Sequence, residues 1–220
     1  MRKIVVLCSW MFFAVICLAP SSCRRQQIQQ PYQPTWSSEA TSSDQSEQYV
    51  EAEALFKEKK YDDVIRILSG PASAEPTNLK LNVLLAKAQV EKCAILKETG
   101  NMSYKVLIHQ PYETAGRLHK LQPHPELYYI VAKSLLINNR YSRAKRTINK
   151  ALYYSPNNPD YLLVLGDVYL GLSKFRKDDP YYEKRLLTKA KAAYERAVEI
   201  KNEVKGYVDL KIQQISEKLK

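Results

Sequence analysis

Apolar residues recur along this chain at the spacing of helices. No segment alternates between apolar and polar residues in the manner of a half-buried strand. Asp179 directly before Pro180 also favours a helix start, because proline suits the first helical position and an acid faces the positive helix end. We therefore expect an all-α protein. The apolar spacing predicts helices over residues 46–59, 62–69, 78–98, 112–121, 125–138, 141–154, 159–175, 181–201 and 204–218.

The C-terminal segment carries its apolar residues at helical spacing. These residues are Val204, Val208, Ile212, Ile215 and Leu219. Such a helix fits a cap that covers the apolar face left open by the elements before it. Residues 205–220 are therefore predicted to form a capping helix.

Two consecutive stretches of the chain share one 34-residue frame, in which Ala132 lies 34 residues before Gly166 and Tyr128 lies 34 residues before Leu162. Small residues at such positions let paired helices approach closely, and large ones fill the gaps between them. The later stretch holds the motifs Leu162-x-x-Leu165-Gly166-x-x-Tyr169 and Ala190-x-x-x-Tyr194-x-x-Ala197.

These motifs resemble those of the tetratricopeptide-repeat family, with Leu162 where the family pattern has Trp. The resemblance covers roughly residues 45–204, in repeats at 45–78, 79–124, 125–158 and 159–204. The second and fourth repeats are about 12 residues longer than the family period, with the surplus between Gln89 and Leu118 and between Tyr169 and Ala190. The resemblance implies a right-handed superhelix of about four helix-turn-helix repeats. A generic bundle of Ala-rich helices is the alternative.

The N-terminus has the features of an export signal. Met1-Arg2-Lys3 is followed by an uncharged apolar run that is too short for a membrane span of about 20 residues. Residues 1–22 resemble a bacterial lipoprotein signal, which implies a fatty-acyl (palmitate) chain on Cys23. Residues 23–44 form a polar tether. The resemblance implies a periplasmic protein of the bacterial cell envelope, lipid-anchored to its inner or outer membrane. Cleavage after Ser21 without lipidation and an uncleaved anchor remain alternatives.

The sequence offers no recognisable catalytic, cofactor or metal site. His109, His119 and His124 lack the spacing of ligands on a helix and have no cysteine partners. Cys93 stands in an apolar helical context typical of a buried residue. We expect no enzyme activity, no cofactor and no bound metal.

The formal net charge of the chain is +11. A basic balance favours anionic partners, although nucleic acid is not expected for an exported protein. Most basic residues alternate with acids and fit a solvated helix face. The best candidate for an anionic-surface patch consists of Arg140, Arg143, Lys145 and Arg146.

In the tetratricopeptide-repeat family, the first helix of each repeat lines a concave groove. The resemblance therefore implies a mainly apolar partner-binding groove. The alternative is that these side chains pack between neighbouring first helices or under the chain's own tail. The implied groove residues are Tyr49, Glu53, Phe56, Val83, Lys87, Val90, Tyr129, Lys133, Leu136, Leu163, Asp167 and Leu170.

The segment 173–184 is a second candidate contact surface. Its aromatic residues Phe175, Tyr181 and Tyr182 either anchor a partner or pack inside a longer helical hairpin. We expect an adaptor that binds an unidentified envelope protein in the groove, for envelope assembly or as a transporter accessory. A binding protein that passes a small hydrophobic ligand to a membrane transporter is the alternative. Self-association through apolar repeat surfaces stays open.

Overall fold

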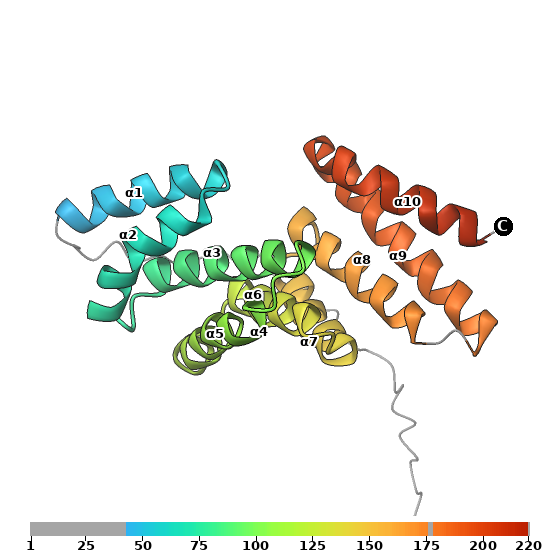
Figure 1. Ribbon diagram of the computed structural model, residues 1–220, viewed down its shortest axis with the longest axis horizontal. Coiled ribbons are helices and arrows are strands. Elements are labelled where there is room, and N and C mark those ends of the chain that lie inside the picture. Colours follow the sequence, from blue (N-terminus) through green and yellow to red (C-terminus); the bar gives the residue numbers. More distant parts are fainter. Residues whose placement is uncertain (1–42, 176–177, 220) are drawn as a thin grey trace, which may run out of the picture. The chain divides into compact units, whose positions relative to one another are not determined.

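The computed structural model describes residues 43–175 and 178–219 (Figure 1). Within these residues the chain is helical and contains no strand, as expected from the sequence. The predicted signal segment, Cys23 and the tether as far as residue 42 lie outside the described residues. The helices are α1 (Ser43–Lys57), α2 (Tyr61–Ala74), α3 (Leu79–Glu98), α4 (Tyr104–Leu107), α5 (His109–Leu121), α6 (Pro125–Ile137), α7 (Tyr141–Tyr154), α8 (Pro159–Lys174), α9 (Pro180–Ile200), the 3₁₀ turn η1 (Asn202–Val204) and α10 (Lys205–Leu219).

The helices pack as a row of hairpins in chain order. The pairs α1–α2, α3–α5, α6–α7 and α8–α9 form the hairpins, and α10 packs on α9. Among the described helices, each hairpin contacts only the hairpins next to it in the sequence. The first helices α1, α3, α6 and α8 also contact one another in that order. A structure of this kind is stabilised by nearest-neighbour interfaces.

Three first helices end in the same turn. The second residue after each helix adopts a positive φ, and the next amide donates to a carbonyl five residues earlier, as in the Schellman motif. The positive-φ residues are Lys59 (62°), Gly100 (76°) and Asn139 (58°). The bonds run from Lys60 N to Leu55 O (2.9 Å), from Asn101 N to Leu96 O (2.8 Å) and from Arg140 N to Leu135 O (2.8 Å).

Three first helices also begin alike. Asn78, His124 and Asn158 are N-caps whose side chains accept a bond from a backbone amide in the first turn. The acceptor distances are 3.2 Å for Asn78, 3.2 Å for His124 and 3.0 Å for Asn158. These residues are 46 and 34 residues apart, which are the repeat lengths predicted from the sequence. A capped start satisfies amides that have no partner inside the helix.

Apolar clusters bind each hairpin to the next. One cluster joins α1, α2 and α3, a central one runs from α3 to α8, and a third joins α8, α9 and α10. Gly166 of α8 lies directly against the ring of Tyr194 of α9, so these two motif residues meet in space. Val208 and Ile215 of α10 are buried in the third cluster, where a capping helix would place them.

Two details differ from the predicted helices. The surplus of the second repeat forms a turn and the short helix α4, which apolar spacing cannot reveal in four residues. Helix α2 continues to Ala74 through Pro71 instead of ending at residue 69. Gly70 lowers one cost of this continuation, because a residue without Cβ relieves part of the clash between a proline ring and the residue before it. None of the described helices is long and apolar enough to cross a membrane.

Candidate functional site

The structure divides the predicted groove residues into two groups. Val83, Val90 and Tyr129 are buried and belong to the central apolar cluster, so they cannot line an open groove. These three side chains instead pack between neighbouring helices, which was the alternative to a groove. The partly exposed members are Tyr49, Glu53, Phe56, Lys87, Lys133, Leu136, Leu163, Asp167 and Leu170. They come from α1, α3, α6 and α8, and we call them the first-helix face.

The charged members on α3 and α6 are bound to the neighbouring hairpin. Lys87 of α3 forms an ion pair with Glu126 of α6 at 3.0 Å. Lys133 of α6 pairs with Glu91 of α3 at 2.5 Å. Tyr129 donates from its hydroxyl to the same Glu91 at 3.0 Å, and burial, with Glu91 beside it, raises the pKa of Tyr129 well above its usual value. These half-buried charges therefore join one repeat to the next.

Polar contacts of the same kind join α8 to α6 and to α10. Tyr161 of α8 donates to Glu126 of α6 at 2.9 Å. Asp167 of α8 pairs with Lys211 of α10 at 2.5 Å and accepts from the hydroxyl of Tyr194 at 2.6 Å. Burial alone would lower the pKa of Lys211, but Asp167 and the hydroxyl of Tyr207 together outweigh it and the net shift of the pKa is upward. Lys211 thereby holds α10 against α8.

On the fourth repeat, α10 contributes to the cover of the first-helix face. Leu163 and Leu170 pack against the cluster that contains Val208 and Ile215 of α10. On the first repeat, Tyr49 donates to Glu53 at 2.8 Å, and Lys80 lies 4.0 Å above its ring centroid. The first-helix face thus combines partly covered aromatic and aliphatic side chains with charges that are paired within the protein. Each of the four helices contributes one charged residue to this face, and the predicted role of the face in partner binding stays a prediction.

The predicted basic patch lies at the start of α7, in a hollow of about 700 Å³. Arg140, Arg143, Lys145 and Arg146 all line it. Leu172, Phe175 and Tyr182 line it from the other side. From the sequence, the basic patch and the segment 173–184 were two separate candidate surfaces. In the structure, residues of both line the same hollow. No spacing signal could reveal this, because the two segments meet only through the packing of α7 on α8.

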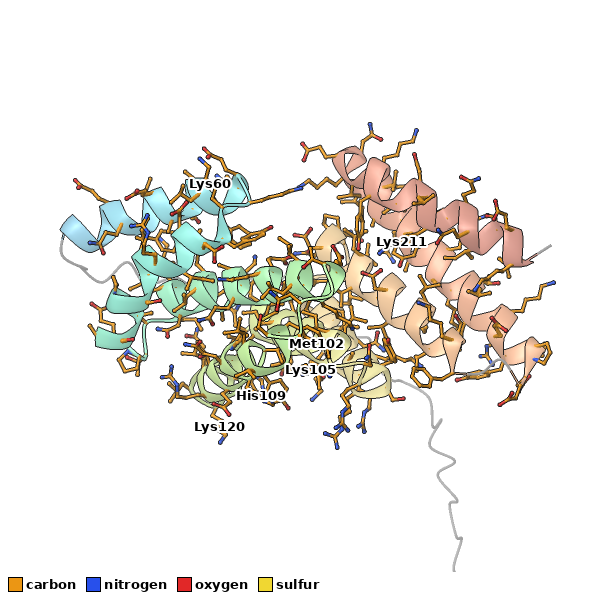
Figure 2. The ribbon with its side chains drawn as sticks, in the orientation of Figure 1. Lys60, Met102, Lys105, His109, Lys120 and Lys211 are labelled. Carbon is orange, nitrogen blue, oxygen red and sulfur yellow. The ribbon has the colours of Figure 1, made fainter. Side chains whose placement is uncertain are left out.

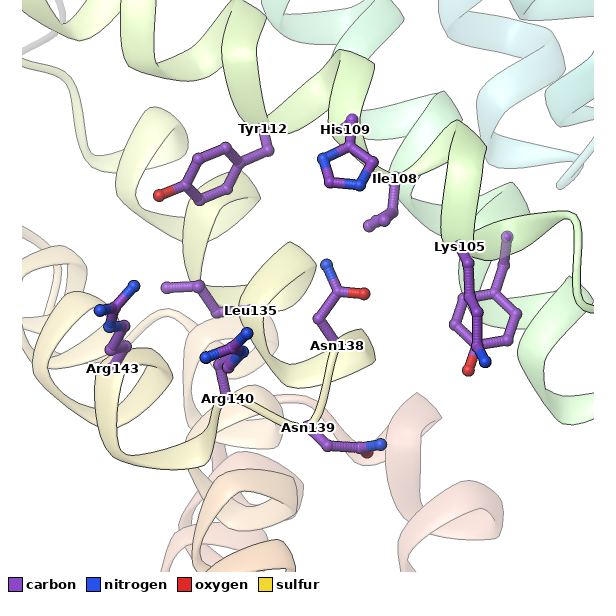
Figure 3. Close-up of a pocket in the computed structure, with 10 residues that line it drawn as sticks. Lys105, Ile108, His109, Tyr112, Leu135, Asn138, Asn139, Arg140 and Arg143 are labelled. Carbon is purple, nitrogen blue, oxygen red and sulfur yellow. The ribbon is translucent and has the colours of Figure 1, made fainter.

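A second hollow of about 470 Å³ shares Asn139, Arg140 and Arg143 with the first. Lys105 and His109 line it from the junction of α4 and α5 (Figure 2). Figure 3 shows Arg140 and Arg143 on one side of this hollow, with Tyr112 and His109 opposite. Helix α4, which the sequence did not predict, supplies part of this wall. We call the two adjoining spaces the basic hollows.

The aromatic residues of the segment 173–184 stand mainly in solvent. Phe175 is 68 % exposed and Tyr181 is 79 % exposed. Phe175 contacts Tyr141 of α7 with ring centroids 5.5 Å apart. The interpretation in which these rings pack between the two helices of a hairpin therefore does not describe Phe175 or Tyr181.

The remaining candidates have structural roles. His124 is the buried N-cap of α6, and His119 rests against the ring of Tyr128 at 4.6 Å between centroids. Cys93 is 1 % exposed, and burial raises the pKa of its thiol to about 11. Across residues 43–175 and 178–219, no three of the His, Cys, Asp and Glu side chains gather as a metal site would require.

Two comparisons with known proteins give no relative from which a role could be inferred. No protein-family model matches the chain. No curated protein matches it either.

Proposed function

We propose that this chain is an adaptor of the tetratricopeptide-repeat type, which holds a protein partner and performs no chemistry itself. In this proposal the repeats stack as a right-handed superhelix, and an acyl chain on Cys23 tethers the protein to a membrane of the bacterial cell envelope. The partner is an envelope protein that the adaptor keeps near that membrane, in envelope assembly or beside a transporter.

One observation carries the proposal: corresponding residues of successive hairpins do the same structural work. Asn78, His124 and Asn158 cap first helices, and Lys59 and Asn139 end them, at the repeat spacings of the sequence. In this scaffold the half-buried charges join neighbouring hairpins to one another. Stacked repeats of this kind form extended surfaces that bind partners. Pairs such as Lys133–Glu91 use charges of the first-helix face to join neighbouring hairpins, which favours a structural over a catalytic role for them.

The partner-binding residues we favour are the apolar members that α10 leaves accessible. Phe56 of α1 and Leu136 of α6 occupy corresponding positions in their repeats, 80 residues apart, and both are partly exposed. Lys87 stands 5.7 Å from the ring centroid of Phe56, so a partner would meet an aromatic ring beside a paired charge. Such mixed surfaces are typical of protein interfaces. The basic hollows give no support to the alternative of a small hydrophobic ligand, because arginines line both.

Site-specific photo-crosslinking in cells tests the proposal. A photoreactive amino acid replaces Phe56 in one strain and Leu136 in another. A third strain carries it at Tyr153 of α7, which is 60 % exposed and lies on a second helix. We expect one adduct of the same mass from Phe56 and Leu136 and none from Tyr153. Equal labelling at all three positions, or none at Phe56 and Leu136, would contradict partner binding on the first-helix face.

A further inference from the structure

We propose that the basic hollows form a binding site for a phosphate group, carried by a lipid headgroup or by a soluble phosphate ester. This inference is independent of the proposed function, because none of the residues involved belongs to the first-helix face. It assigns a ligand to a surface that the adaptor proposal leaves without a role.

The side chains that line the hollows carry a net positive charge. Arg140 and Arg143 line both hollows, Lys145 and Arg146 line the larger, and Lys105 lines the smaller. No aspartate or glutamate is among the described residues that line either one. Cations with no carboxylate between them raise the local potential and attract anions.

In the part of the chain that the structure describes, the arginines of the hollows differ from the lysines of the first-helix face and its cap in having no carboxylate partner. The lysines of the first-helix face and its cap, such as Lys87, Lys133 and Lys211, each pair with a carboxylate. Within the described residues, neither Arg140 nor Arg143 forms an ion pair. The fold therefore does not use their charges to join its own hairpins.

The N-terminus of α7 also favours a bound anion. Arg140 is its N-cap and makes no side-chain capping bond, and the first turn contains no acid. Helices α3, α6, α8 and α9 each have a side chain that accepts at this place. Positive side chains at the positive end of a helix are unfavourable, and a bound anion would offset that cost.

The number of donors favours phosphate over a carboxylate. An arginine binds two oxygens side by side, so one guanidinium already engages both oxygens of a carboxylate. The larger hollow offers three arginines and a lysine, together with the amide or hydroxyl groups of Asn139, Ser142 and Asn149. A phosphate group presents more oxygens in more directions and can engage several of these donors at once.

Exposed apolar side chains border the hollows and leave room for the rest of the ligand. Phe175 lines the larger hollow. Tyr112, 40 % exposed, lines the smaller one. Apolar residues next to cations occur where proteins meet anionic lipids, and aromatic rings equally accept the organic part of a soluble ester. The phosphate is common to both sources, so the experiment must separate them.

Isothermal titration of the full chain provides the test, with three probes. The probes are inorganic pyrophosphate, dihexanoyl phosphatidylglycerol below its micellar concentration, and dihexanoyl phosphatidylcholine as the zwitterionic control. The variant is Arg140→Gln/Arg143→Gln. The matched control is Lys120→Gln/Lys218→Gln, which removes the same charge at exposed sites on α5 and α10, outside the hollows (Figure 2 labels Lys120). Circular dichroism checks that both variants keep the helicity of the wild type.

We expect the wild type and the control to bind pyrophosphate or the anionic lipid, and the arginine variant to bind it at least tenfold more weakly. Tighter binding of phosphatidylglycerol than of both other probes assigns the site to a lipid headgroup. Tighter binding of pyrophosphate assigns it to a soluble phosphate ester. Equal affinity of the arginine variant and the control, or binding of none of the anionic probes by the wild type, would overturn the proposal.

Discussion

A methyl group placed on Gly166 of α8 would lie 2.5 Å from Cε1 of Tyr194 on α9. Tyr194 is fully buried, and its hydroxyl donates to Asp167 at 2.6 Å, so the ring cannot move aside without losing that bond. Gly166→Ala is therefore expected to destabilise the folded state by about 1–3 kcal/mol through overpacking. Chemical denaturation followed by circular dichroism measures the change.

Gly116 of α5 provides the control for that substitution. It is also a helical glycine, but an added Cβ would meet no atom within 4 Å. Gly116→Ala should leave the free energy of unfolding unchanged or raise it by about 0.5–1 kcal/mol, because alanine favours the helix. If both substitutions change the free energy of unfolding by the same amount, Gly166 does not lie as close to Tyr194 as the structure places it.

A single substitution in the turn after α1 is expected to stabilise the folded protein. Lys59 adopts a φ of 62°, which costs a residue with a Cβ about 1 kcal/mol, whereas Gly100 fills the similar turn after α3 without that cost. Lys59→Gly should raise the free energy of unfolding by about 0.5–1 kcal/mol. Ala54→Gly, at an exposed position inside α1, should lower it by a similar amount. A loss of stability in both variants would show that Lys59 is not strained.

The stability of the protein should fall as the pH falls below about 6.5, because of His124. Burial lowers the pKa of this imidazole from its ordinary value of 6.5. Below pH 6.5 the unfolded chain therefore binds more protons than the folded chain, and stability is lost as the pH falls toward the lower folded pKa. Protonation of Nδ1 would also remove the acceptor for the amide of Glu126.

His124→Asn separates this effect from that of the other histidines. Asparagine is a strong N-cap and occupies the corresponding positions 78 and 158. The variant should keep the stability of the wild type within about 0.5 kcal/mol at pH 7.5 and lose less of it at pH 5.5. Denaturation at both pH values gives the comparison. Identical pH dependence in the two proteins would assign the titration to another group.

Cys93 should be inert in the folded protein. Burial raises the pKa of its thiol to about 11, although Lys92 acts in the opposite direction, and the side chain is 1 % exposed. Only the thiolate reacts with alkylating agents, so iodoacetamide at pH 8 should leave the peptide containing Cys93 unmodified. The same reagent in denaturant should modify it fully. Rapid labelling of the native protein, followed by mass spectrometry, would contradict the burial.

The sequence predicted those features of the fold that depend on local pattern. Helix α7 was expected at residues 141–154 and is found there, because its apolar positions recur strictly and a turn precedes it. The passage of α2 through Pro71 was missed, since a proline normally ends a helix. Helix α4 was missed because four residues hold too little periodicity.

The candidate sites were less predictable, because they depend on which side chains meet across hairpins. The sequence contained Lys133 and Glu91, but their 42-residue separation gave no sign that they would pair. Val90 fell on the expected groove position, yet the close approach of α3 and α6 buries it completely. The basic residues at the start of α7 were identified, whereas the hollow around them required the position of α8 and Phe175.

The pairing of half-buried charges between neighbours also means that the hairpins are not interchangeable modules. Lys133 and Asp167 occupy the same position in successive repeats, 34 residues apart, with opposite charge. A chain that lost the α6–α7 hairpin would bring α8 next to α3 and would set Asp167 against Glu91, where Lys133 now stands. Like charges in a half-buried contact oppose such a junction. The sign of the charge at this junction thus ties the α6–α7 hairpin to its place in the row and would resist its loss by recombination.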